Sequence, residues 1–191
     1  MPAFHETPST GPCADLAAAM QAMVPVLETK RLVLRAPRIE DFQDFARIVL
    51  SPQGTTYGDP ANREEAWSEF MQLTGTWMLR GHGTWVVTLK TDGKTIGLVQ
   101  LGAEPGDLAP ELGYLLDAEF EGQGYASEAA RAVRDHGFGT FELPKIASYI
   151  DKSNARSIAL AHRLGAVEDT PTDWAEHDTL AFRHKAGGTD Q

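Results

Sequence analysis

Two glycines separated by one residue, Gly122 and Gly124, stand between an apolar run and a helical pattern. The apolar run ends at Leu116, and the helical pattern begins at Ala126. The order of strand, glycine turn and helix directs a row of backbone N–H groups and the positive end of a helix dipole toward one point. Because the first N–H groups of a helix have no carbonyl partner, such a point binds phosphate. The spacing therefore predicts a site for an anionic, phosphorylated ligand.

A pair of glycines is a weak signal by itself, since this spacing more often marks a turn or close backbone packing. Two nucleotide-binding motifs are tested position by position. A P-loop, GxxxxGK[ST], requires a lysine that follows neither glycine here. A dinucleotide fingerprint, GxGxxG, requires a third glycine where Ser127 stands, and an acidic residue about 20 positions further on, where the sequence has Pro144. Neither motif fits, and a purely structural turn stays as the alternative.

A longer pattern that includes this turn resembles the GNAT superfamily of acetyl-CoA-dependent N-acetyltransferases. The pattern consists of the run ELGYLLDAEFEGQGYASEAARAV, followed by NARSIALAHRLGA at residues 154–166. The opening LETKRLVLRAPRIEDF, residues 27–42, is similar to the branch that includes the RimJ/RimL ribosomal-protein-alanine acetyltransferases. The resemblance covers residues 27–184 and implies an acyl-CoA N-acyltransferase-like fold. In that fold, a splayed and mostly antiparallel central sheet is flanked by helices.

The glycine signature of the superfamily, Q/R-x-x-G-x-G/A, begins here at Glu121, where the family has Gln or Arg. A carboxylate beside a diphosphate is unfavourable unless its side chain points away. The resemblance implies that the backbone N–H groups of residues 122–126 and the Ser127 hydroxyl bind the diphosphate of coenzyme A. It also implies that pantetheine enters the splay like an added strand, beside Tyr114 and Leu116.

The second motif adds two residues to this expected cofactor site. By similarity, Asn154 reaches pantetheine and Ser157 reaches the phosphate end, while simple capping of a helix is the alternative role for Asn154. The residues that the resemblance assigns to coenzyme A are Tyr114, Leu115, Leu116, Glu121, Gly122, Gln123, Gly124, Tyr125, Ala126, Ser127, Asn154 and Ser157.

Glu111 is the candidate general base of the acyl transfer. An alkyl amine with a pKa of about 10 is mostly protonated at neutral pH, so a base adds about 10²–10⁴-fold to its acylation. Glu111 begins the strand that would hold the thioester, where several superfamily members place a glutamate. The alternative is an acidic residue at a solvent-facing strand end.

The general acid of many superfamily members, a tyrosine in the last helix, has no counterpart in this sequence. Counted from Asn154, its position holds Ala161. Tyr114 and Tyr125 are the remaining proton donors, although tyrosines at such positions are more often packing residues. Coenzyme A thiolate also leaves without assistance, so the vacancy does not exclude activity.

The amine acceptor is expected at the turn-rich loop SPQGTTYGDP, residues 51–60, where the superfamily places acceptor-binding elements. Tyr57 and Asp59 are the candidates in this loop, and His82, between two glycines, is a third. A plain connecting loop is the alternative. The six histidines show neither HExxH nor paired ligand spacing, so we expect no metal.

Composition bounds the partners and the compartment. The 191-residue chain carries a net charge of −10, which would repel a nucleic acid and favour the arrival of a cationic amine. The single cysteine, Cys13, allows no intrachain disulfide and indicates a reducing cytoplasm. No apolar run approaches the ~18 residues of a membrane span, so no membrane partner is expected.

Hydrophobic periodicity predicts an α+β (mixed α/β) domain over residues 26–185, with an N-terminal extension (1–25) and a polar tail (186–191). The expected helices are 14–23, 39–50, one that follows the N-cap Asn62, 126–141 and 154–164. The expected strands are 31–35, 84–90, 95–101, 111–116, 146–150 and 179–184, with an Asp-Gly hairpin turn between the second and the third.

The sequence thus predicts an N-acetyltransferase that uses acetyl-CoA, without a metal or a covalent enzyme intermediate. The acceptor is a small-molecule or peptide amine, a protein N-terminal α-amine included. A non-catalytic acyl-CoA-binding or regulatory module is the alternative, which Glu121 and Ala161 favour. Monomer and homodimer both stay open.

Overall fold

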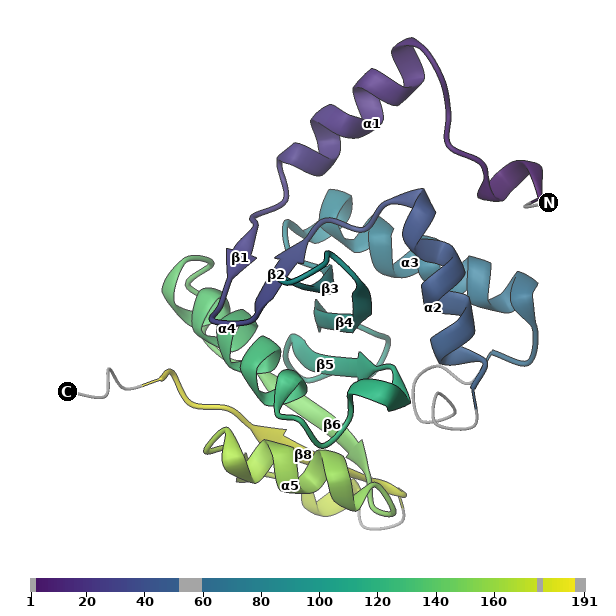
Figure 1. Cartoon of the computed structure of the whole chain (residues 1–191). Coiled ribbons are helices and arrows are strands. Elements are labelled where there is room, and N and C mark those ends of the chain that lie inside the picture. The colour runs from purple at the N-terminus through teal and green to yellow at the C-terminus, as the bar shows by residue number, and fades with distance from the viewer. Residues whose placement is uncertain (1–2, 52–59, 175–176, 188–191) are drawn as a thin grey trace.

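Strand pairing joins the predicted strands into one sheet in the computed structural model, which describes residues 3–51, 60–174 and 177–187. The described sheet has eight strands: β1 (Leu27–Glu28), β2 (Leu32–Arg35), β3 (Thr84–Leu89), β4 (Thr95–Gly102), β5 (Glu111–Leu116), β6 (Ala147–Asp151), β7 (Val167–Glu168) and β8 (Thr179–Arg183). Their order across the sheet is β1-β2-β3-β4-β5-β6-β8-β7 (Figure 1). Neighbours are antiparallel except β5 and β6, so the predicted mixed α/β class is confirmed.

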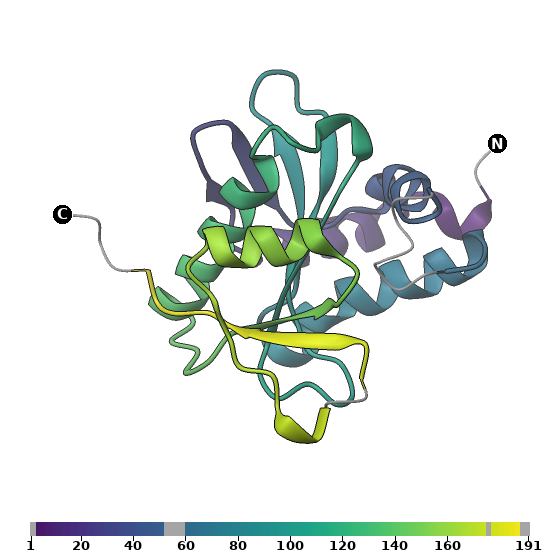
Figure 2. The ribbon, with the colours of Figure 1, turned by 90° about the horizontal axis from the view of Figure 1, so that it is seen from below.

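Helices cover both faces of this sheet. The described helices are η1 (Phe4–Glu6), α1 (Pro12–Ala22), η2 (Ile39–Asp41), α2 (Phe42–Val49), α3 (Arg63–Arg80), η4 (Ala118–Phe120), α4 (Tyr125–Gly139), α5 (Ala155–Arg163) and η5 (Thr172–Trp174). Helices α2 and α3 pack on one face, and α4 and α5 on the other (Figure 1 and Figure 2). Helix α1 buries no residue and stands apart from the sheet (Figure 1).

The alternation of side chains along β5 divides its residues between the two layers. Leu112 and Leu116 belong to the core beneath α4, whereas Leu115 packs with the aromatic residues of α2 and α3. This division follows from the two-residue period of a strand. On α4, the buried Ala129 and Ala130 have side chains small enough to bring that helix close to the sheet.

Local signals placed most elements within two residues of their observed bounds. The Asn62 side chain accepts hydrogen bonds from two N–H groups of α3, as expected of an N-cap, and Gly93 adopts φ 74° in the hairpin turn. Strands β1 and β7 were not predicted, because two residues are too few to show a period. The first turn of the predicted 39–50 helix is the 3-10 helix η2, where the Asp41 carboxylate accepts from the Arg38 N–H at 2.8 Å.

Candidate active site

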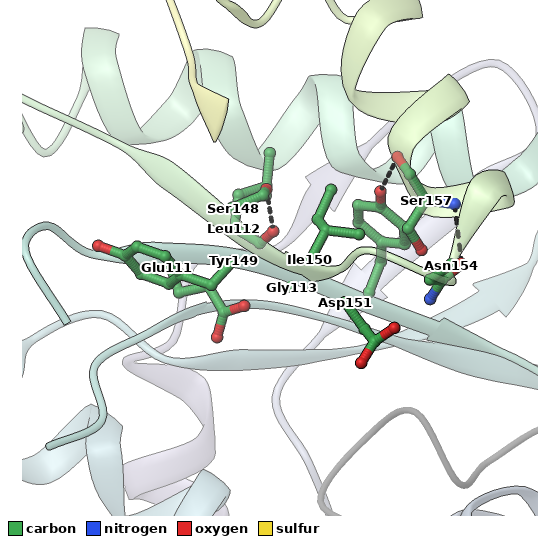
Figure 3. A pocket seen from close by; sticks show the side chains of 10 residues that line it. Glu111, Leu112, Gly113, Ser148, Tyr149, Ile150, Asp151, Asn154 and Ser157 are labelled. Atoms are coloured by element: carbon green, nitrogen blue, oxygen red, sulfur yellow. Dashed lines mark hydrogen bonds between the residues drawn. The ribbon is translucent and has the colours of Figure 1, made fainter. Parts of the chain in front are cut away.

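The parallel strands β5 and β6 separate almost as soon as they meet. They are in register only at Glu111 and Ala147. A cavity of about 80 Å³ lies in the opening, where the start of α5 meets the two strands (Figure 3). We call this cavity the splay groove; its lining residues are Glu111, Leu112, Gly113, Tyr114, Ser148, Tyr149, Ile150, Asp151, Asn154 and Ser157.

Backbone groups of β5 alternate between β4 and the splay groove. The N–H of Asp117 donates to the carbonyl of Ile96 at 2.9 Å, so odd-numbered residues of β5 direct their backbone groups to β4. Tyr114 and Leu116 therefore direct theirs to the side on which β6 separates. An extended ligand needs this orientation to pair as an added strand. Leu115, by contrast, has its backbone groups occupied by β4.

The glycine turn is open, and both of its glycines have left-handed backbones. Gly122 has φ 71° and Gly124 has φ 80°. Gly124 is the N-cap of α4, and no side chain caps that helix. Its first backbone bond runs from the N–H of Glu128 to the carbonyl of Gly124, at 3.1 Å. The N–H groups of residues 125–127 therefore have no helix carbonyl to donate to, which leaves them free for an anion.

A second hollow, of about 400 Å³, opens beside this turn along α4. Ser127, predicted to supply a hydroxyl, lies in its wall together with Gly124. A Cβ placed on Gly122 would meet no atom within 4 Å, so the turn is not filled by the described side chains. The hollow is lined by Thr29, Gly124, Ser127, Glu128, Arg131, Ala132 and Asp135.

Arg31 and Glu128, which were not predicted as site residues, tie the glycine turn to the hairpin between β1 and β2. Arg31 donates to the carbonyl of Gln123 at 2.9 Å and to the Glu128 carboxylate at 2.6 Å. Its guanidinium lies 4.1 Å from the ring centre of Tyr125. Burial raises the pKa of Glu128, but hydrogen bonds from Thr29 and Arg31 outweigh it and hold that pKa below its ordinary value.

Glu121, the departure from the family signature, forms an ion pair with Arg156 of α5. The carboxylate is thereby drawn toward α5, and its charge is balanced at the turn. Arg156 is largely exposed and was not predicted from the sequence. The side chain of Gln123 folds back on the carbonyl of Glu119 at 2.9 Å, so Gln123 offers the site its backbone.

Asn154 and Ser157 lie together at the start of α5 and line the splay groove. The Asn154 side chain accepts from the N–H of Ser157 at 3.1 Å and caps the helix (Figure 3). Across the groove, the Tyr114 hydroxyl donates to the carbonyl of Ser157 at 3.1 Å. Burial raises the pKa of Tyr114 to about 12, so this phenol keeps its proton at neutral pH.

Glu111 lies at the other end of the splay groove from this helix start. Burial raises the pKa of its carboxyl to about 7, and the charges of Asp107 and Glu104 act in the same direction. The N–H of Tyr149 lowers it, which places that N–H close to the carboxylate. A carboxyl with such a pKa can accept and release a proton at neutral pH.

Of the three acceptor candidates, only His82 lies within the described residues. Tyr57 and Asp59 lie outside the described residues. His82 is buried, its Nδ1 lies 2.7 Å from the carbonyl of Leu101, and it does not line the splay groove.

The described ranges contain neither a metal centre nor a membrane-spanning helix. No cluster of three or more His, Cys, Asp or Glu side chains there is arranged to hold a metal ion. Within the same ranges, every helix is too short or too polar to span a bilayer.

The part of the chain that holds this site matches a known protein family. Residues 31–167 match the acetyltransferase (GNAT) domain. The chain is 36% identical over 92 residues to the uncharacterized protein YkkB of Bacillus subtilis, and 32% identical over 79 residues to spermidine N(1)-acetyltransferase of Escherichia coli K12. These alignments cover 45% and 40% of this chain, and only 52% and 42% of the two relatives.

Solved structures match a larger share of the chain. An acetyltransferase from Agrobacterium tumefaciens is 34% identical, with a TM-score of 0.79 over 85% of this chain and 95% of that one. RimL, a ribosomal L7/L12 α-N-protein acetyltransferase in complex with coenzyme A, matches with a TM-score of 0.70 over 85% of this chain and 100% of its own. At 20% identity, that second likeness concerns the fold alone.

Proposed function

Because the chain belongs to the GNAT family of acetyltransferases, we propose that it transfers the acetyl group of acetyl-CoA to a primary amine by direct attack in a ternary complex. Two features of the site support the proposal: the helix start at the glycine turn is uncapped, and Glu111 in the wall of the splay groove is a carboxyl with a pKa of about 7. The first feature suits an anionic cofactor and the second suits proton transfer.

In this proposal, the coenzyme A moiety extends from the glycine turn into the splay groove. Its diphosphate accepts hydrogen bonds from the backbone of residues 122–127 and from the Ser127 hydroxyl. Its pantetheine arm extends along β5, where Tyr114 and Leu116 present backbone groups, and passes Asn154. Supporting this placement, the turn is free of capping side chains and two cations, Arg31 and Arg156, flank it.

Glu111 acts as the general base. It takes a proton from the ammonium group of the acceptor, directly or through a water, so that the neutral amine attacks the thioester carbonyl carbon. The tetrahedral intermediate then loses its second nitrogen proton to solvent, the carbon–sulfur bond breaks, and coenzyme A leaves as the thiolate. The raised pKa of Glu111 supports this role, because a base that titrates near neutrality both accepts and releases the proton readily.

Tyr114 is the proton donor toward the departing thiolate. Its hydroxyl is bonded to Ser157, one turn before the buried Ala161 that stands where relatives have a tyrosine. A side chain from β5 thereby reaches the helix that supplies the acid in other members of the superfamily. Its pKa of about 12 makes it a weak acid, so its share of the rate is smaller than that of Glu111.

The acceptor is a primary amine, and two classes of amine are candidates: a polycationic small molecule and a protein N-terminal α-amine. Asp107 and Glu104 add negative charge around Glu111, which favours a polycationic amine such as the one named for the Escherichia coli relative. A protein N-terminal α-amine, with Tyr57 and Asp59 as contacts, follows instead from the proposed place in the RimJ/RimL branch. The lone Cys13 supports a cytoplasmic location for either reaction.

The test is release of free thiol from acetyl-CoA over a panel of peptides, polyamines, amino acids and aminoglycosides. We expect turnover with at least one class, and the class identifies the acceptor. Calorimetry with acetyl-CoA is the companion measurement. Binding without thiol release across the panel would favour the non-catalytic acyl-CoA-binding module, and absence of binding would reject the proposed site altogether.

A further inference from the structure

The splay groove opens at the point where the ladder between β5 and β6 is interrupted. The N–H of Ala147 donates to the carbonyl of Pro110 at 3.0 Å. In a regular parallel ladder, the N–H two residues further along β6, that of Tyr149, would donate to the carbonyl of Leu112. The N–H of His184 donates to the carbonyl of Ile146, so even-numbered residues of this strand direct their backbone groups to β8. The odd-numbered Tyr149 therefore directs its backbone groups to β5.

A side chain occupies the carbonyl that this missing bond would use. The Ser148 hydroxyl donates to the carbonyl of Leu112 at 2.6 Å (Figure 3). The same hydroxyl lies 2.9 Å from Nε2 of His184, the residue that follows β8. Both side chains are buried, with residue exposures of 2% and 3%.

The geometry fixes the direction of these two hydrogen bonds. A hydroxyl has one proton, and a carbonyl accepts only, so the proton of Ser148 lies toward Leu112. His184 must then carry its proton on Nε2 and donate it to Ser148. Its Nδ1 is a bare lone pair, which agrees with the absence of a partner for that atom among the described residues.

We propose that Ser148 and His184 are positioning residues that hold the splay groove open. With the Leu112 carbonyl occupied by Ser148, the N–H of Tyr149 has no ladder acceptor and stays in the groove beside Glu111. His184 holds the hydroxyl in the rotamer that reaches Leu112. The part of this inference that concerns ligand binding rests on the proposed function; the part that concerns the ladder does not.

The decisive variant is Ser148→Ala, which frees the Leu112 carbonyl. We expect the Tyr149 N–H to enter the ladder, so that its amide hydrogen exchange, followed by NMR, slows by about tenfold. The groove then narrows, and the acetyl-CoA dissociation constant rises by about tenfold. Ser148→Thr, which keeps the hydroxyl, is expected to restore both values.

Thr88→Val is the matched control, since Thr88 is also buried and donates from its hydroxyl to a strand carbonyl, that of Val33, at 3.0 Å. It is expected to leave both values at the level of the wild type. Unchanged Tyr149 exchange in Ser148→Ala would overturn the proposal even if stability fell. If the wild type fails to bind acetyl-CoA, the proposed function is lost, while the exchange measurement still decides the ladder.

A measurement on the unaltered protein covers the case in which Ser148→Ala does not fold. The ¹⁵N chemical shifts of His184 report which ring nitrogen carries the proton. We expect a neutral ring with the proton on Nε2. A proton on Nδ1 would mean that His184 does not donate to Ser148, and would overturn the arrangement.

Discussion

The glycine turn and the Glu111 end of the splay groove differ in which part of the chain supplies their polar groups. At the turn, backbone N–H groups point outward because Gly122 and Gly124 adopt left-handed conformations and no side chain caps α4. At the other end, a single carboxyl acquires its property from burial and from neighbouring acids. The first end depends on backbone shape, and the second depends on one side chain in a particular environment.

The two ends also differ in charge. Each arginine at the turn is balanced by a carboxylate, Glu128 for Arg31 and Glu121 for Arg156, whereas the two charges that raise the pKa of Glu111 are both negative. A negative field of this kind favours the approach of a cation at the Glu111 end. This difference predicts that changes at the Glu111 end act on turnover, while changes at the turn act on cofactor affinity.

The largest expected effect is that of Glu111→Gln. We expect kcat to fall by about 10²–10⁴-fold, because the amine loses its base, while acetyl-CoA affinity stays near that of the wild type. In the wild type, kcat/KM should rise with pH and level off above about pH 7, since only the ionised carboxyl accepts a proton. That rise should be absent in the variant when rates are followed by thiol release.

Glu69→Gln is the control for this experiment. Burial and the charge of Glu104 raise the pKa of Glu69 to about 7 as well, but Glu69 does not line the splay groove. It should keep kcat within about threefold of the wild type. An equal loss in both variants would mean that charge around the groove, rather than a base, sets the rate.

Glu111→Gln should lower kcat but raise the free energy of unfolding at neutral pH. Below the model-compound pKa of 4.5, the carboxyl is neutral in both the folded and the unfolded state and costs no stability. As pH rises from there to the folded pKa of about 7, only the unfolded state ionises readily, so the free energy of unfolding of the wild type falls. The glutamine variant lacks this loss. Thermal unfolding as a function of pH should therefore show a flatter profile for the variant, with its advantage largest above about pH 7.

Next in size is Gly124→Val. A β-branched residue is strained at φ 80°, so the turn must reorganise and its N–H groups no longer converge. We expect acetyl-CoA to bind at least about tenfold more weakly by calorimetry. Gly81→Val is the control, because Gly81 has φ 71° and open space around it but ends α3. Equal affinity in the two variants would contradict the diphosphate assignment.

A smaller loss is expected for Arg31→Ala. Removal of the guanidinium releases the Gln123 carbonyl and the Tyr125 ring, and we expect about fivefold weaker acetyl-CoA binding with little change in kcat. Arg63→Ala is a matched control: Arg63 pairs with a carboxylate and lies over an aromatic ring, but at the start of α3. If Arg31→Ala lowered kcat as much as it lowered affinity, the hypothesis that the glycine turn acts on cofactor affinity alone would be contradicted.

The smallest effect, and the only gain in acetyl-CoA affinity, is expected for Glu121→Gln. The substitution removes a negative charge from the turn and frees Arg156 for the cofactor, so affinity should improve by about two- to threefold at low salt. Glu119 lies in the adjacent η4 and its carboxylate pairs with Lys94, so Glu119→Gln should have no such effect. Weaker binding in Glu121→Gln would show that its pairing with Arg156 is needed to shape the turn.

Local interactions explain why much of this fold was predictable from the sequence. The cap at Asn62, the hairpin turn at Gly93 and the start of α4 after Gly124 each depend on residues within a few positions of one another. Hydrophobic periods identified the long elements for the same reason. The order of strand, glycine turn and helix therefore indicated where the uncapped helix start would form.

Only the tertiary structure decided how distant residues complete the site. Arg31 and Glu128 are 97 positions apart, and the Ser148 hydroxyl reaches a carbonyl 36 positions away. Such pairings produce no recognisable pattern in the sequence, because they depend on how strands and helices pack. The pKa of Glu111 has the same origin. Strand periodicity places this carboxyl at the start of β5, but burial and the charges of Asp107 and Glu104 raise its pKa, and these surroundings arise only on folding.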